Sequence, residues 1–178
     1  MTLSLTYRET WAVIHGMMLG SLFLLAYAGG LAELINLSSV WSTEAGVIKR
    51  VRRLKIGTRV MAVVAWLTVI TGTYIVYPWY RANPPAGADL TMFPRSLLLS
   101  KPETAEWHKF GMEWKEHVAW LAPILATAVA YMVTKYGVRL AKDAQVRRAV
   151  IVLFTISFCT AAIAGLFGAF INKAAPIH

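Results

Sequence analysis

The sequence predicts an all-α fold, a polytopic membrane four-helix bundle with an extra amphipathic helix in a long loop. Two observations support this prediction. Apolar residues make up 57% of the 178 residues, and the mean hydropathy is +0.54, whereas soluble domains contain about 45–50% apolar residues. The excess lies in four long blocks separated by polar, basic segments, which is the pattern of a chain that crosses a bilayer several times.

Each apolar block is assigned as a membrane-spanning helix, because a span needs roughly 20 residues at about 1.5 Å of rise per residue. The predicted spans cover residues 11–37, 60–77, 118–133 and 149–171. The first block is too long for the apolar part of a signal peptide, so we expect it to be retained. Small residues recur in the first and last blocks and allow close helix approach, which predicts one transmembrane domain over residues 1–178.

Basic residues gather in the two short loops that follow the first and third blocks. Eleven of the 18 Lys and Arg residues lie there, namely Lys49, Arg50, Arg52, Arg53, Lys55, Arg59, Lys135, Arg139, Lys142, Arg147 and Arg148. The positive-inside rule places these loops in the cytoplasm and both termini outside, as expected for a multi-pass protein of a bacterial-type inner membrane. Anionic lipid headgroups then explain the net charge of +9 without a nucleic-acid partner.

The loop between the second and third spans, residues 78–117, is expected to be irregular in its first half and helical in its second. Its turn-rich stretch, residues 83–87, contains Asn-Pro-Pro-Ala-Gly, which disfavours a helix. Ser100 and Glu103 have the spacing of a capping box. Residues 103–117 are therefore predicted to form an amphipathic helix that lies along the membrane surface or continues into the third span.

Two histidines are predicted to enter the membrane at one depth on neighbouring helices. His15 lies about one turn into the first block, on a helical face with small residues, and His117 stands at the head of the third. Both blocks run in the same direction, and two such imidazoles are what an axially bis-ligated haem b requires. One haem near the outer face is therefore predicted. The predicted cofactor-binding residues are His15, His117, Trp11, Met18, Trp114 and Trp120.

Charged residues near these histidines are candidates for supporting the haem. Basic side chains could pair with haem propionates at the outer surface, and the candidates are Arg8, Arg81, Arg95, Lys109 and Lys115. Glu113 or Glu116 could accept the second ring N–H of a histidine and so orient it.

Several alternatives stay open at the level of sequence. His117 lies beside tryptophans and also fits an amphipathic anchor at the membrane interface. His15 could instead serve as an ionisable relay or hydrogen-bond to another helix. His108 and Met112 share a helical face and form an alternative metal pair, suited to copper together with His117, although plain amphipathicity explains that spacing too.

Glu33 is the only acidic residue inside a predicted span. An intramembrane carboxylate is a functional candidate, here a possible proton relay. Because Glu33 lies near the cytoplasmic end of the first span, it could equally reach water or pair with Arg59 or Arg139.

Several classes of function lack support in the sequence. Phosphate-binding glycine loops, metalloprotease helices and serine-nucleophile turns are absent from the 178 residues, so nothing favours a hydrolase, kinase or ATPase. The single cysteine, Cys159, excludes an internal disulfide, a zinc cluster of cysteines and a covalently attached c-type haem.

In architecture, and through His15 and His117, the chain resembles small four-helix membrane cytochromes of the b type. The resemblance covers the helical bundle and implies an electron-transfer subunit, working between a quinone and a redox partner among other membrane subunits. Such cytochromes often carry two haems, but the inner half of this chain has no histidine, so at most one is expected. The alternatives are a cofactor-free accessory subunit of a respiratory or photosynthetic complex and a periplasm-facing copper site.

Overall fold

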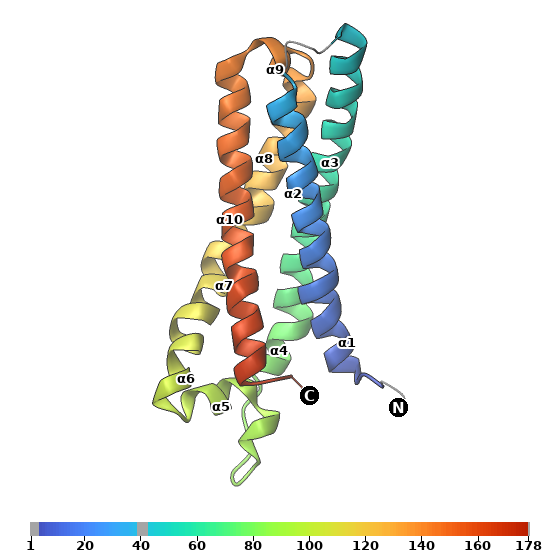
Figure 1. Cartoon of the computed structure of the whole chain (residues 1–178). Helices are drawn as coiled ribbons and strands as arrows, with labels where there is room; N and C mark the ends of the chain where they lie inside the picture. The colour runs from blue at the N-terminus through green and yellow to red at the C-terminus, as the bar shows by residue number, and fades with distance from the viewer. Residues whose placement is uncertain (1–3, 39–42, 178) are drawn as a thin grey trace. The chain divides into compact units, whose positions relative to one another are not determined.

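The computed structural model describes residues 4–38 and 43–177. Every regular element in these residues is helical. Four helical runs are long and apolar enough to cross a membrane (Figure 1), and they are Tyr7–Asn36, Glu44–Tyr80, Pro102–Tyr136 and Ala144–Ala174. The all-α fold with four apolar spans is therefore confirmed.

Most of these runs are built from several consecutive helical elements. The first contains α1 (Tyr7–Val13), the π-helical turn η1 (Ile14–Met18) and α2 (Leu19–Asn36). The second contains α3 (Glu44–Thr71), the π-helical turn η2 (Gly72–Val76) and α4 (Tyr77–Tyr80). The third contains α6 (Pro102–Glu106), the π-helical turn η4 (Trp107–Met112), α7 (Glu113–His117), the 3₁₀ turn η5 (Val118–Trp120) and α8 (Leu121–Tyr136). The remaining elements are η3 (Leu90–Met92), α5 (Pro94–Leu99), α9 (Arg139–Lys142) and α10 (Ala144–Ala174).

Two of the runs are much longer than the predicted spans. The second begins at Glu44 rather than at residue 60, because Lys and Arg are good helix formers and continue the helix beyond its apolar part. The third begins at Pro102, so the loop helix continues directly into the span, which was one of the two expected arrangements. The predicted capping box is wrong: Lys101 is the N-cap of α6, and the Ser100 hydroxyl instead donates to the Leu97 carbonyl over 2.8 Å.

The chain forms two compact units, and each is described separately. Unit 1 comprises Met1–Gly20, Leu67–Trp120 and Ala161–His178, and unit 2 comprises Ser21–Trp66 and Leu121–Thr160. Unit 1 therefore brings together segments near both chain ends and the long loop, whereas unit 2 contains the two short basic loops.

Unit 2 is held together by close packing of aliphatic, aromatic and small side chains. The Tyr27 and Phe158 rings are stacked with centroids 4.0 Å apart, and the Tyr27 hydroxyl lies 3.1 Å from the hydroxyl of Thr155. Ser157 donates to the Ala122 carbonyl over 2.8 Å, joining α10 to α8. Because lipid offers no hydrophobic drive between helices, such contacts and interhelical hydrogen bonds stabilise the unit.

Gly30 is a point of close approach between α2 and α10, and it yields a stability prediction. A Cβ there would lie 2.8 Å from ring carbons of the buried Phe154, whereas a Cβ at neighbouring Gly29 would meet nothing within 4 Å. Gly30→Ala is expected to lower the free energy of unfolding by about 1–3 kcal/mol through overpacking. Gly29→Ala is the matched control and should not destabilise, since alanine favours a helix. Denaturant unfolding in detergent measures both changes, and equal stability of the two variants would contradict this explanation.

Unit 1 has a core of its own where the long loop meets the end of α10. Its buried residues are Tyr80, Leu98, Met112, Ile171 and Ala175. Gly111 lets η4 approach α10, since a Cβ there would lie 3.3 Å from the Phe167 ring. This packing fixes the helical segments of unit 1 on which the candidate functional side chains stand.

Candidate functional site

His15 is held inside unit 1 by residues of the second helical run. The ring is partly buried, and its Nδ1 lies 3.3 Å from Oγ1 of Thr71, the last residue of α3. The ring also rests against Gly72, the first residue of η2, where a Cβ would lie 2.7 Å from Cε1 of the imidazole. The imidazole thus occupies space that only a glycine leaves free.

The hydrogen bonds of Thr71 determine which ring nitrogen of His15 carries the proton. The Thr71 hydroxyl donates to the Leu67 carbonyl over 2.7 Å, with the Thr68 carbonyl 3.2 Å away. A hydroxyl has one hydrogen, so towards His15 its oxygen acts as an acceptor. We therefore assign the proton to Nδ1, which leaves the lone pair of the neutral ring on Nε2. This is the tautomer in which a histidine, oriented through its other nitrogen, binds a metal.

Both helical runs that meet at His15 are interrupted there by π-helical turns. His15 lies in η1, and Gly72 opens η2. A π turn adds a residue to the helix and rotates the following side chains by about 100° relative to a continuous α-helix. Met18, which a regular helix would place on the face of His15, is 55% exposed. Such turns are rare and occur frequently at functional sites.

Lys115 is the second polar residue that unit 1 directs towards its interior. From α7 it extends to α10, where its Nζ lies 3.4 Å from the Ala164 carbonyl and 2.8 Å from the position of a Cβ on Gly168. Within residues 4–38 and 43–177, Lys115 forms no ion pair with a carboxylate. A cation so placed in a membrane-spanning helix is a candidate for ligand binding.

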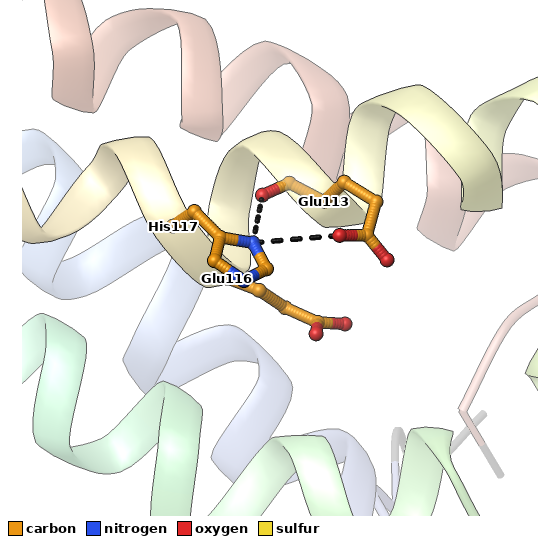
Figure 2. Close-up of side chains that lie close together, drawn as sticks. All are labelled: Glu113, Glu116 and His117. Atoms are coloured by element: carbon orange, nitrogen blue, oxygen red, sulfur yellow. Dashed lines mark hydrogen bonds and ion pairs between the residues drawn. The ribbon is translucent and has the colours of Figure 1, made fainter.

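His117 lies in a different environment from His15. Its side chain is 70% exposed, and Nδ1 lies 3.0 Å from the Glu113 carbonyl and 3.4 Å from Oε2 of the Glu113 side chain (Figure 2). Residues two apart on a helix point about 200° apart, so a Lys115 that points to α10 leaves His117 on the opposite side. In the described residues no hydrogen bond or ion pair joins His15 to His117, and haem ligation by both stays a prediction.

The alternative metal pair, His108 and Met112, makes structural contacts in unit 1. Nδ1 of His108 lies 2.8 Å from the Tyr80 hydroxyl. Met112 is buried in the core that also contains Tyr80 and Leu98. His117 has Glu113 as its partner instead, so these contacts do not gather His108, Met112 and His117 into one ligand set, and the copper site stays a prediction.

The tryptophans expected around a cofactor lie in aromatic contacts of unit 1 or are partly buried. Trp11 packs edge-on against Tyr7, with centroids 6.4 Å apart, and Trp114 packs edge-on against Phe167 at 6.3 Å. Trp120 is partly buried in η5. These rings provide apolar, planar surfaces close to the segments that carry His15 and Lys115.

Glu33 is paired in unit 2, but with different partners from those expected. Its carboxylate lies 3.0 Å from Nη1 of Arg50 and 3.5 Å from Nη1 of Arg53. Arg59, one of the expected partners, instead donates to Thr134 over 3.3 Å. The difference arises because α3 begins at Glu44, so that Arg50 and Arg53 stand on ordered helical turns that face Glu33. The Glu33 carboxylate therefore has two arginines as ion-pair partners. A role for Glu33 as a proton relay stays a prediction.

A polar cluster at the end of α4 was not expected from the sequence. Nη1 of Arg81 lies 3.7 Å from Oε2 of Glu116 and also donates to the Tyr77 hydroxyl. The hydrogen bond with Tyr77 raises the pKa of Arg81 above its ordinary value, so this side chain stays cationic. Arg81 and Glu116 are distant in sequence, and the fold of unit 1 brings them together.

No family model, curated protein or solved structure matches the chain. Its function is therefore inferred from the geometry of unit 1.

Proposed function

We propose that the chain is a membrane electron-transfer subunit that holds one haem b in unit 1, with His15 as its protein ligand. It passes electrons between a quinone and a redox partner, and it works beside other membrane subunits. A bound haem supplies the one-electron chemistry, and the protein supplies the ligand, the orientation and the electrostatic surroundings. The resemblance to b-type cytochromes and the geometry around His15 support the proposal.

The observation that carries the proposal is the hydrogen bond between His15 and Thr71. Metal-binding histidines almost always donate their second ring N–H to a neighbouring acceptor, which fixes the ring and raises its basicity. Thr71 plays that part, and its own proton is committed to a backbone carbonyl. Nε2 of His15 is thereby left as the ligand atom.

Of the other candidate residues, Lys115 suits a bound haem and His117 is not needed for it. Lys115 extends from α7 to α10 without a carboxylate partner among the described residues, and a protonated lysine would suit a propionate. His117 is largely exposed and contacts Glu113 in the described conformation, so the proposal does not depend on it. The proposal therefore names His15 as the residue that would hold the haem.

The visible absorption spectrum of the purified, untagged protein tests the proposal. We expect a Soret band, reduced-minus-oxidised bands of a b-type haem and about one haem per chain. A protein without these bands after expression with sufficient haem would contradict the proposal. It would favour a cofactor-free accessory subunit, which copurification with a larger membrane complex would then identify.

The proposal places unit 1 on the outer side of a bacterial-type inner membrane, because the basic loops belong to unit 2. In a Cys159→Ser background, Ala86→Cys in the exposed long loop is expected to react with a membrane-impermeant maleimide in intact spheroplasts. Gln145→Cys, exposed at the start of α10, is expected to react only after permeabilisation. The opposite labelling pattern would reverse the topology.

A further inference from the structure

We propose that the corner between α9 and α10 in unit 2 binds one anionic phospholipid. Its phosphate contacts Arg139, Lys142 and Arg148, and an acyl chain lies along an apolar stripe of α10. The positive-inside rule concerns only the average charge of a loop, whereas this proposal names one site. It uses no residue assigned to the haem, and it is independent of whether haem is bound.

Two shallow grooves adjoin where α9 leads into α10 (Figure 1). The first is lined mainly by polar side chains, at Arg139, Lys142, Asp143, Ala144 and Gln145. The second is lined by Gln145, Arg148, Ala149, Val152 and Leu153. Gln145 belongs to both, so the charged groove continues into one whose far end is apolar. A phospholipid has the same order, with a charged headgroup followed by an acyl chain.

The second groove follows one face of α10. Its lining residues are spaced i, i+3, i+4, i+7 and i+8 from Gln145, which is the spacing of a single helical face. Val152 is 50% exposed and Ala149 is exposed, so this part of the stripe is open to lipid. Arg148 stands at the boundary between the apolar stripe and the charged groove, where a basic side chain can reach a headgroup.

The basic side chains of the grooves have no acidic partner in the protein as described. Arg139, Lys142 and Arg148 are all exposed, and within residues 4–38 and 43–177 none of them forms an ion pair with a carboxylate. Arg139 contacts the ring of Tyr136, with its Cζ 5.9 Å from the ring centroid, but this contact supplies no negative charge. The three cations are therefore complementary to a phosphate, which arginine and lysine bind through charge-assisted hydrogen bonds.

Hydrogen bonds to the backbone fix the corner that carries these cations. Nη1 of Arg147 donates to the Leu140 carbonyl over 2.7 Å and to the Ala141 carbonyl over 3.2 Å. Oδ1 of Asp143 accepts from the backbone N–H of Val146 over 3.1 Å at the start of α10. Of the described residues that line the two grooves, only Asp143 is acidic, so the site keeps a positive charge. A backbone already ordered in this way lowers the entropic cost of binding.

Native mass spectrometry of the detergent-purified full chain tests the inference. The wild type should bind one dioleoyl phosphatidylglycerol more tightly than dioleoyl phosphatidylcholine, which has the same chains but no net charge. Lys142→Gln and Arg148→Gln should each weaken phosphatidylglycerol binding about fivefold, the factor expected for one basic residue at an anionic surface. Lys49→Gln and Arg52→Gln remove exposed charges of α3 outside both grooves, so these matched controls should bind as the wild type does.

Three results would overturn the inference. The first is a wild type that does not prefer phosphatidylglycerol. The second is equal weakening by the groove variants and the α3 controls, since diffuse attraction to a basic surface predicts that result. The third is displacement of the lipid by an equal concentration of glycerol 3-phosphate, which would show a site for phosphate alone. Size-exclusion chromatography establishes that each variant is folded, and two independent groove variants keep the test decisive if one of them is not.

Discussion

His15→Ala is expected to remove the haem from the purified protein, whereas His117→Ala is expected to retain it. The difference follows from the environments of the two rings. His15 is fixed through Thr71 with Nε2 available inside unit 1, and His117 is largely exposed and held by Glu113 on the opposite side of α7 from Lys115. Haem per chain, measured as the pyridine haemochrome, gives the comparison.

The outcome for His117→Ala is the decisive part of this comparison. Loss of haem from both variants, with both eluting as folded protein, would show that His117 turns inward in the loaded protein and completes a bis-histidine site. Retention of haem in both would exclude His15 as the ligand.

Gly72→Ala is expected to lower haem affinity about 10–100-fold, the range typical of lost support around a metal ligand. The added Cβ would lie 2.7 Å from Cε1 and 3.3 Å from Nε2 of His15, so the ring must leave its hydrogen bond with Thr71. Haem retention during titration with apomyoglobin as acceptor measures the change.

Gly57→Ala provides the matched control for that substitution. It makes the same change in the same helical run, at a position where a Cβ would meet nothing within 4 Å. Equal haem retention by Gly72→Ala and Gly57→Ala would show that the position of the His15 ring against η2 does not matter for binding.

The four spans were predictable because apolar blocks of this length seldom occur outside membrane-spanning helices, and the structure confirms four helices of sufficient length and apolarity. The ends of the helices were not predictable from hydropathy. The segment between Glu44 and residue 60 is basic yet helical, since Lys and Arg favour a helix, and hydropathy marks only the apolar part of a continuous helix.

At the candidate site, the sequence could indicate the direction of a side chain only where the helix keeps the regular α-helical period. The sequence suggested that His15 packs against other helices, and the structure places it against Thr71 and Gly72. The π turn at His15 has no simple sequence signature, and it rotates the residues after it. Met18, which the sequence placed on the face of His15, is exposed.

The sequence also did not indicate which face of the third span points towards α10. Lys115 and His117 are two residues apart, so one of them must point away whenever the other points inward. Only the contact of Lys115 with the Ala164 carbonyl shows which of the two faces α10. The arrangement of Arg81 and Glu116 likewise depends on packing between segments distant in sequence.

The central claim is that Nε2 of His15 is the protein's bond to haem iron, and imidazole rescue tests it most directly. His15→Ala, purified without its haem, is incubated with haemin in the absence and presence of added imidazole, and the Soret region is recorded. We predict that free imidazole, entering the space that the missing ring leaves beside Gly72, restores a haem complex like that of the wild type. A variant that binds haem equally well without imidazole would contradict the claim.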